Sequence, residues 1–589
     1  MTGFLGFAPI YINGLLALFF VFVLPGMLVV RALDIPNVPQ RWLAIFLGSV
    51  TFNHLLVTLI ALLHLTPVTS YRVVAAGMMA TLVFLAVKDR RAPQGHPFAG
   101  AATVTLWDIR CGLTSLAVLG LAYFSVWKYG VPHVFAEGDV SISWNRWALI
   151  WSQGLFPTLS YGYPQFVPTL WAVTYIFTGS TEHYFAHLIH VVLIIVPIVL
   201  TAMVLGRGNW WKPASLILVF VWFVTEIQDG WLKSTLYEGF PDWVAAVSAF
   251  CGAALFITNA PENRLDKDKI LTALLSLGLL SVAAVTKPIF GLFAIAVLTA
   301  ICIDAGRNLG TRDRNRFLAA AAGLFFAFVA AYALLYWHLA VRSMPHYPVS
   351  ELSDRLSRAL SLFNRSFTLP FRILAIAGLL ISPFLPRVRW LALPLLISIS
   401  VWANTASYDL RNVLGPVLIC AFIPVYAAAR AWIRRGDVTG GRRWVVSDGV
   451  LAIGLAASAI GLTLTLAVSD QTLKQRFADE QLREGSGRAI NAKVGEMLQQ
   501  GCTVLTGNAY FYTVAAFQPF KDQLQYSTFG ERIDDPTLAL LREPKGCTGI
   551  LYVPGRTHPS VLDFIAARTD AGGFRKLVED RGAVLMVSD

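Results

Sequence analysis

The sequence predicts a polytopic α-helical membrane protein with about 14 transmembrane helices and a small α/β domain at its C-terminus. Of its 589 residues, 56% are hydrophobic and only 14% are charged, little more than half the charged fraction of a soluble protein. Apolar runs long enough to cross a hydrocarbon core of roughly 30 Å recur as far as residue 468. These runs must be helices, because backbone groups inside a bilayer have to satisfy their own hydrogen bonds.

The apolar runs divide into candidate spans separated by polar turns. The first has no basic n-region and no small-residue cleavage site, so we interpret it as a retained helix rather than a signal peptide. The stretch Pro168–Phe177 is too short to cross and is expected to be a re-entrant or interfacial helix. The candidate spans are residues 8–30, 42–64, 71–87, 111–128, 184–205, 213–228, 241–259, 270–286, 288–304, 317–340, 371–386, 390–407, 412–433 and 446–468.

The net charge of +12 is concentrated in short basic clusters between these runs, which indicates topology rather than nucleic-acid binding. We place the cluster around Arg90 in the cytoplasm. The clusters that strict alternation then puts on the same side are those at Arg207, Arg264, Arg312, Arg387 and Arg434. This agreement is the positive-inside signature, and it makes both the N-terminus and the tail after about residue 470 external.

The topology divides the chain into three parts. Residues 1–107 carry extra N-terminal transmembrane helices, residues 108–468 form the main transmembrane domain, and residues 469–589 form a soluble external domain. The main domain has longer external loops at 129–183, 229–242 and 341–372.

The tail alternates short strands, at 502–506 and 548–553, with helices, which is typical of an α/β domain. Its expected helices are 478–499, 535–542 and 558–571. Cys502 and Cys547 each lie at or just before a strand start, where neighbouring parallel strands would bring them close. In an oxidising external compartment they form a disulfide; the alternative is two free buried thiols.

The densest polar group lies in the first external loop, where Glu137-Gly138-Asp139 is followed by Trp144-Asn145-Arg146 and by Tyr163. One interpretation is a carboxylate at the membrane surface, flanked by aromatic rings that stack on a sugar, with Asp139 as general base and Glu137 as the second candidate. The alternative is an interfacial cap, in which the acids cap a helix and the tryptophans join the aromatic belt.

Topology places Asp139, Asp242, Lys287 and Arg411 on one external face, each at a helix end. Two acids and two cations at headgroup level suit the joint handling of a hydroxyl and a phosphate. Each later residue also has a structural interpretation: Asp242 caps its helix, Lys287 snorkels, and Arg411 pairs with Asp409.

In their order and sidedness these motifs resemble the GT-C superfamily of polyprenyl-phosphate-sugar glycosyltransferases, such as protein O-mannosyltransferases and bacterial aminoarabinose transferases. Glu137-Gly138-Asp139 resembles the superfamily's acidic motif, Gly239-Phe240-Pro241-Asp242 its Gly-Tyr-Ala-Asp-like motif, and Thr286-Lys287 its Thr-Lys turn. The resemblance covers roughly 108–468. The chain departs from the pattern in its three preceding helices and in Tyr408-Asp409-Leu410-Arg411, which stands where the superfamily has Arg-Tyr.

The resemblance implies a glycosyltransferase of the bacterial inner membrane, which moves a sugar from a polyprenyl-phosphate donor to a glycan, lipid or protein acceptor on the periplasmic side. Asp139, or else Glu137, would take the proton from the acceptor hydroxyl. The residues expected to bind the donor phosphate are Arg411, Lys287 and Arg146. Those expected to bind the remaining substrate are Trp144, Asn145, Tyr163 and Asp242. The two acids are compatible with a divalent metal, but no cluster has metal-ligand spacing, so no metal or cofactor is predicted.

Other classes of function make different predictions. An O-antigen polymerase or ligase would put Arg and His in a large late external loop, whereas here the longest loop, 129–183, comes early. A transporter of lipid-linked sugars would show an internal repeat and broken or charged helices at mid-membrane, and no clear repeat is present. A receptor or scaffold would need the tail but not Asp139.

Overall fold

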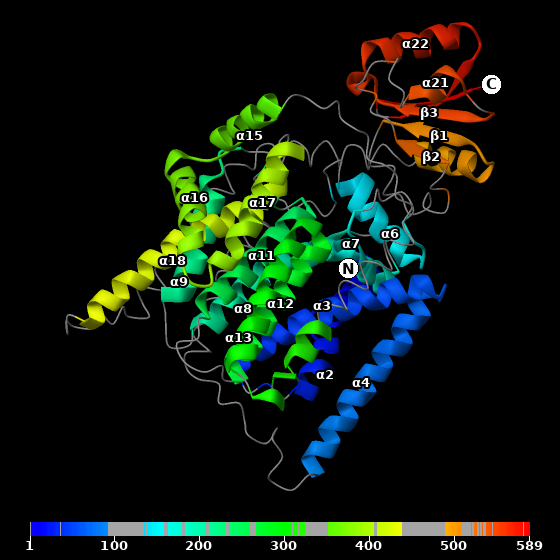
Figure 1. Ribbon diagram of the computed structural model, residues 1–589. Helices are drawn as coiled ribbons and strands as arrows, with labels where there is room; N and C mark the ends of the chain where they lie inside the picture. Colours follow the sequence, from blue (N-terminus) through cyan, green and yellow to red (C-terminus); the bar gives the residue numbers. More distant parts are fainter. Residues whose placement is uncertain are drawn as a thin grey trace. The chain divides into compact units, whose positions relative to one another are not determined.

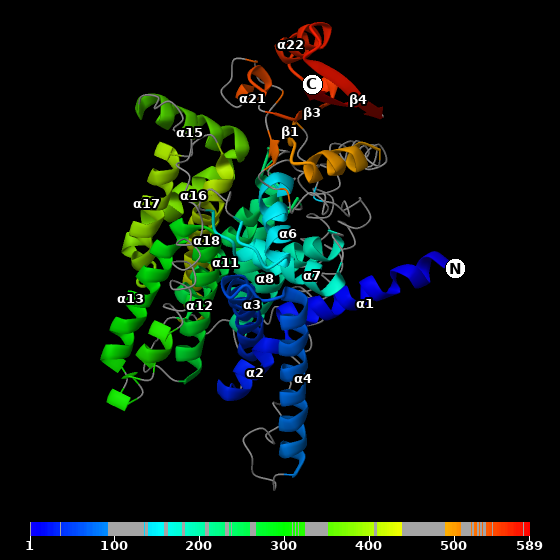
Figure 2. The ribbon, with the colours of Figure 1, turned by 90° about the vertical axis from the view of Figure 1, so that its right-hand side faces the viewer.

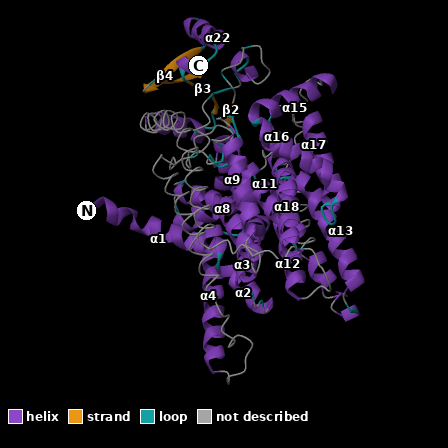
Figure 3. Ribbon diagram, turned by 90° about the vertical axis from the view of Figure 1, so that its left-hand side faces the viewer, coloured by secondary structure: helices purple, strands orange, loops and turns teal. Residues whose placement is uncertain are grey.

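The computed structural model describes two compact units of the chain, residues 1–131, 151–180 and 184–470 in the first and 132–150, 181–183 and 471–589 in the second. Helices build the first unit, and all the described strands belong to the second (Figures 1 and 3). The residues whose structure is described are 2–91, 135, 140–206, 211–259, 267–323, 352–438 and 489–588, with gaps at 34, 36, 158–162, 180–182, 230–231, 233–234, 237, 309, 313, 316, 406–408, 508–519, 521–522, 527–528, 530–532, 534–537, 545 and 581.

The first unit is a bundle of mostly apolar helices (Figure 2). Its helices are α1 (Thr2–Phe22), α2 (Leu24–Leu33), α3 (Val38–Leu62), α4 (Pro67–Arg91), α7 (Phe166–Thr178), α8 (Tyr184–Gly206), α9 (Trp211–Glu226), α11 (Pro241–Thr258), α12 (Lys267–Thr286), α13 (Gly291–Asn308), α15 (Leu352–Ser366), α16 (Leu369–Ile381), α17 (Arg389–Thr405) and α18 (Leu414–Val438). Three short 3₁₀ helices stand between them: η2 (Pro288–Phe290), η3 (Ser382–Phe384) and η4 (Leu410–Val413). The π-helix η1 (Val140–Asn145), which belongs to the second unit, leads into α6 (Arg146–Ser152).

Among the described residues, eight helices are long and apolar enough to cross a membrane, which makes this a multi-pass membrane protein. They correspond to eight of the candidate spans. The expected total of about 14 is not confirmed. Three further expected spans form helices, but α9, α16 and α17 have only 16, 13 and 17 residues. The runs at 111–128 and 446–468, and most of 317–340, lie outside the described residues.

Two apolar segments differ from the expected layout. The span expected at 8–30 is divided between α1 and α2 at Val23, just before Pro25, whose ring and missing N–H disfavour an uninterrupted helix. The expected short helix at Pro168–Phe177 is present as α7, but it is an interior helix packed against α1, α3 and α8. Every residue from Phe166 to Ile176 is buried, so α7 does not have the exposed face of an interfacial helix.

Helix α11 is the centre of the first unit, because every one of its residues is buried. It packs most extensively against α12, where Ser276 Oγ donates a 2.7 Å hydrogen bond to the Gly252 carbonyl. At its C-terminus, cations from other elements reach its last carbonyls. Arg387 donates to the Phe256 carbonyl at 3.4 Å, and Lys212 donates to the Thr258 carbonyl at the same distance. Positive charge at this end of a helix complements the helix dipole.

Helix ends that the alternation assigns to one side lie together in space. On the side assigned to the cytoplasm, Arg387, before α17, forms a 2.9 Å ion pair with Asp304 near the end of α13. On the same side, Gln40 in the first turn of α3 donates a 2.8 Å hydrogen bond to Thr272 of α12. The ends assigned to the outside meet around Asp242, as described below. The spatial grouping therefore agrees with the alternation read from the basic clusters.

The second unit contains a five-stranded sheet in the order β2-β1-β3-β5-β4. Its strands are β1 (Thr503–Thr506), β2 (Leu524–Tyr526), β3 (Thr548–Tyr552), β4 (Phe574–Asp580) and β5 (Ala583–Ser588). Strand β1 pairs in parallel with β2 and β3, while β5 pairs antiparallel with β3 and β4. The expected strands at 502–506 and 548–553 are thus present, and β2, β4 and β5 are additions that the sequence analysis missed.

Helices cover both faces of this sheet. The helix at 489–499 packs on one face through Ile490, Val494 and Leu498. On the other face lie α21 (Ala539–Arg542) and α22 (Pro559–Asp570), the latter through Val561 and Ile565. Strand β5 is buried throughout and contributes alternate residues to the two cores, as expected for a strand between two helical layers.

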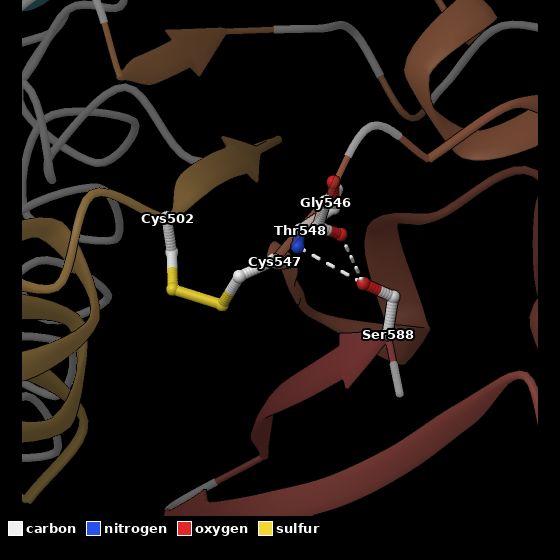
Figure 4. Close-up of a disulfide and its surroundings, with 5 residues drawn as sticks. All are labelled: Cys502, Gly546, Cys547, Thr548 and Ser588. Atoms are coloured by element: carbon white, nitrogen blue, oxygen red, sulfur yellow. Dashed lines mark hydrogen bonds between the residues drawn. A yellow bond between two sulfur atoms is a disulfide. The ribbon is translucent and has the colours of Figure 1, made fainter.

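Cys502 and Cys547 are joined by a disulfide, with their Cα atoms 4.7 Å apart (Figure 4). The parallel pairing of Thr503 with Thr548 brings the two cysteines, one residue earlier on each strand, side by side. Beside the bridge, Ser588 Oγ accepts from the Thr548 N–H at 2.9 Å and donates to the Gly546 carbonyl at 3.1 Å. The last strand is thus tied to the start of β3.

Candidate functional site

Three polar side chains meet where α11 begins, α12 ends and α18 begins. Lys287 forms an ion pair with Asp242 and donates a hydrogen bond to Asn412 Oδ1. The Lys287 side chain is 18% exposed and that of Asp242 only 5%. An ammonium has three N–H donors, so one donor of Lys287 has no partner among the described residues. The cluster therefore presents a cation with unused hydrogen-bonding capacity.

The turn before α11 aims the Asp242 carboxylate at this cluster. Gly239 has φ +94°, a conformation that residues with a Cβ rarely adopt. Pro241 then occupies the first position of α11, where its missing N–H costs nothing. Phe240, the N-cap residue, makes no side-chain capping hydrogen bond. Asp242 lies in the first turn of the helix, where the helix dipole favours a negative charge.

Arg411 lies in η4, held by Asp409. The Asp409 carboxylate accepts from Arg411 Nε at 2.7 Å and Nη2 at 2.5 Å, and also from the Arg411 backbone N–H at 2.9 Å. Trp402 of α17 donates to the Asp409 carbonyl at 2.9 Å. The guanidinium also lies over the Phe240 ring, 4.3 Å from its centroid. The alternative that Arg411 pairs with Asp409 is therefore what the structure shows, and this pair fixes the direction of the guanidinium.

A close backbone approach brings the three elements together. A Cβ on Gly415, in the first turn of α18, would lie 2.6 Å from the Phe290 ring of η2 and 3.2 Å from Ala246 Cα of α11. Glycine at this position lets α18 pack this closely without displacing the Phe290 ring. This approach sets Asn412, three residues before Gly415, against Lys287.

The cluster of Asp242, Lys287, Asp409 and Arg411 is electrically neutral and largely shielded from water. Burying two cations and two acids costs desolvation free energy, and well-packed apolar residues in the same place would not carry that cost. Glu238 is also buried, at 1% exposure, and His190 of α8 is fully buried. Such concentrations of buried ionisable groups are typical of functional sites.

The sequence predicted Asp242, Lys287 and Arg411 on one face, and the structure brings these three together. Asn412 and His190 had no predicted role. Asn412 directly follows Arg411, so its position was a usable signal. A histidine inside the apolar run of α8 was a second signal, because ionisable residues are costly in membrane helices.

Three other expected site residues lie in the second unit. Asn145, at the end of η1, is fully buried and its Nδ2 is 3.1 Å from His183 Nε2. The Trp144 ring meets the Trp147 ring edge to face, with centroids 6.5 Å apart. Arg146 begins α6 and is buried. Tyr163 belongs to the first unit and is 38% exposed; its carbonyl accepts from Gln165 Nε2 at 2.8 Å.

The two carboxylates proposed as bases, Asp139 and Glu137, lie outside the described residues. Within the described part of the chain, no group of three or more His, Cys, Asp or Glu side chains is arranged to hold a metal ion.

Comparison with known proteins leaves the family open. No family model matches the chain, and no curated protein sequence matches it. Among solved structures, ArnT from Cupriavidus metallidurans in the apo state is similar, with 11% sequence identity and a TM-score of 0.47. The similarity covers 82% of this chain and 97% of that chain. At this identity and score it carries no argument about activity, so the resemblance to GT-C enzymes rests on the sequence motifs.

Proposed function

We propose that this protein is a membrane glycosyltransferase that takes its sugar from a polyprenyl-phosphate donor and delivers it to a glycan, lipid or protein acceptor on the external face. The observation that carries the proposal is the meeting of Lys287, Asp242 and Arg411 at one end of the bundle. Lys287 pairs with Asp242, and Arg411 lies over the ring of Phe240, two residues before Asp242. The GT-C-like order of motifs at Asp139, Asp242, Lys287 and Arg411 supports it from the sequence.

In this proposal the donor phosphate binds to Lys287 and Arg411. The third N–H of Lys287 is the first point of attachment, and the ammonium then exchanges Asp242 for the phosphate. Because Asp409 holds Arg411 through Nε and Nη2, the guanidinium keeps its orientation while the donor binds. Both cations then stabilise the charge that grows on the phosphate as the bond to the anomeric carbon breaks, which is commonly the largest catalytic contribution.

The acceptor side is proposed from sequence alone. Asp139, with Glu137 as the second candidate, removes the proton of the acceptor hydroxyl, a contribution typically worth 10²–10⁴-fold. Asp242, displaced from Lys287 by the phosphate, accepts a hydrogen bond from a donor-sugar hydroxyl. Arg146 contributes to phosphate binding, while Trp144, Asn145 and Tyr163 contact the sugars. The donor lipid stays in the bilayer, where each buried CH₂ contributes about 0.8 kcal/mol.

The test is donor binding and turnover by the purified protein with a panel of polyprenyl-phosphate sugars. The variants are Asp139→Asn and Lys287→Met, with Lys212→Met as the matched control, because Lys212 lies at the opposite end of α11. We expect Asp139→Asn to bind donor without turnover, and Lys287→Met to lose donor binding. Lys212→Met should keep both.

Two results would count against the proposal. If no member of the panel binds to the wild type, the glycosyltransferase assignment is wrong. Transport of lipid-linked sugars then becomes the hypothesis to test. If the donor is consumed equally by wild type and Lys287→Met, the enzyme class stands but the phosphate site lies elsewhere.

A further inference from the structure

Helix α15 (Leu352–Ser366), which lies in the external loop expected at 341–372, has three distinct faces. One face packs against the rest of the first unit through Ala359 and Leu362, which are 5% and 6% exposed. A second, neighbouring face is apolar but open: Leu356 and Leu360, four residues apart, are 49% and 61% exposed. The third face carries polar residues, namely Asp354, Ser357, Arg358, Ser361, Asn364 and Arg365.

The helix is fixed on the first unit at several points. Arg355 Nη1 donates a 3.0 Å hydrogen bond to the Asn404 carbonyl at the end of α17. Just after α15, Phe367 forms an antiparallel bridge with Ile227, and the Gln228 N–H donates to the Ser366 carbonyl at 2.8 Å. The end of α17 is thus bound to the first turn of α15, and the end of α9 and the start of α16 lie at its C-terminus. All three are ends that the alternation assigns to the outside.

The open leucines lie next to a helix that carries the same kind of surface. Helix α16 begins two residues after Phe367 and exposes Leu369, Ile373, Ile376 and Leu380 by 52% to 65%. Their spacing of four, three and four residues forms one helical stripe, as expected for a helix that faces lipid. Exposed leucines at the head of such a helix stand where acyl chains meet headgroups.

The charge of the polar face fits one kind of surface. Helix α15 carries Arg355, Arg358 and Arg365 against the single acid Asp354. Arg358 and Arg365 are both exposed and lie on the polar face, about two helical turns apart. An amphipathic helix with open leucines and arginines on its polar face is suited to the boundary of a membrane that contains anionic lipids.

We propose that α15 is an interfacial helix that binds anionic phospholipids of the outer leaflet. Leu356 and Leu360 enter the acyl-chain boundary, and Arg358 and Arg365 contact lipid phosphates. Bound in this way, α15 would lie along the bilayer surface at the external helix ends. This proposal is independent of the glycosyltransferase assignment, because it depends only on the exposed faces of α15.

The test is photo-crosslinking of the full-length protein in lipid nanodiscs that contain phosphatidylglycerol and phosphatidylcholine. The photoreactive residue p-benzoylphenylalanine replaces Leu356 or Leu360, and in matched controls it replaces Ser357 or Ser361 on the polar face of the same helix. Mass spectrometry then identifies what has been captured. We expect phospholipid adducts at 356 and 360 and several-fold fewer at 357 and 361.

The arginines have their own readout. In the Arg358→Gln/Arg365→Gln background, the share of phosphatidylglycerol among the adducts at 360 should fall about fivefold for each arginine removed. Arg314→Gln, at the opposite end of the bundle, should leave that share unchanged. Protein adducts at 356 and 360 would mean that another chain or another part of this one covers the leucines. Either that result, or equal lipid capture at all four positions, overturns the proposal.

Discussion

Lys287, in the turn between α12 and α13, forms its ion pair with Asp242 in the first turn of α11, and the pair joins two helix ends that are adjacent in space. Both side chains are largely buried, so neither charge is well solvated without the other. The pair therefore has a structural effect that must be separated from any catalytic role.

We first predict that Lys287→Met lowers the free energy of unfolding by about 3–5 kcal/mol, because it leaves Asp242 buried without its closest cation. The double variant Asp242→Asn/Lys287→Met removes both charges and should recover most of that loss. Thermal unfolding in detergent measures both effects.

Activity distinguishes the two roles of this pair. If Lys287 binds the donor phosphate, the double variant stays inactive although its stability returns. Recovery of turnover together with stability would show that the pair is only a structural link.

The second prediction concerns the geometry of Arg411. Arg411→Lys keeps the positive charge but loses the planar fork that grips Asp409 through Nε and Nη2. We expect turnover to fall by about 10²-fold or more, as for the loss of a preorganised donor, while the protein remains folded. Steady-state kinetics on a saturating donor make the measurement. A variant with unchanged turnover would mean that charge alone matters at this position.

The third prediction concerns the other end of the bundle. Arg387 adopts a left-handed backbone conformation with φ +64°, while its side chain pairs with Asp304 and reaches the last turn of α11. Burial lowers the pKa of Arg387, and the nearby Asp304 carboxylate opposes that shift. Arg387→Ala should destabilise by about 2–4 kcal/mol, because the ion pair and the cap are lost while the backbone strain stays.

The glycine variant at the same position isolates the backbone contribution. Arg387→Gly loses the same contacts but relieves the left-handed strain, so it should be about 1 kcal/mol more stable than Arg387→Ala. Unfolding midpoints of the two variants, compared in the same detergent, provide the test. Equal midpoints would show that the backbone at 387 carries no strain.

The fourth prediction concerns the disulfide in the second unit. The bridge between Cys502 and Cys547 closes a loop of 45 residues, which corresponds to about 4 kcal/mol of stabilisation in the chain-entropy description. Cys502→Ser/Cys547→Ser should lower the unfolding temperature of this unit. A reductant acting on the wild type should lower that temperature by the same number of degrees. Cys302→Ser, which removes a free thiol, is the control and should retain the full response to reductant.

Much of the fold could be predicted because the bilayer imposes a simple rule. Apolar length and basic clusters identified the helices and their alternation, and the observed pairing of Arg387 with Asp304, and of Gln40 with Thr272, follows that alternation. The parallel strands that directly follow Cys502 and Cys547 were also predictable, because each is a short apolar run beside turn residues. The antiparallel strands β4 and β5 were missed, since charged residues on the outer strand β4 hide its pattern.

The sequence by itself determined that this is a multi-pass helical membrane protein with a small α/β tail, and which charged residues stand at helix ends. These properties depend on local composition and length. Only the tertiary structure decided that Lys287 meets Asp242 and Asn412, that Arg411 is held by Asp409, and that α15 exposes leucines. Such contacts depend on how closely two helices approach each other, and the close approach of α18 to Phe290 at Gly415 is an example. That distance is set by packing between segments far apart in the chain.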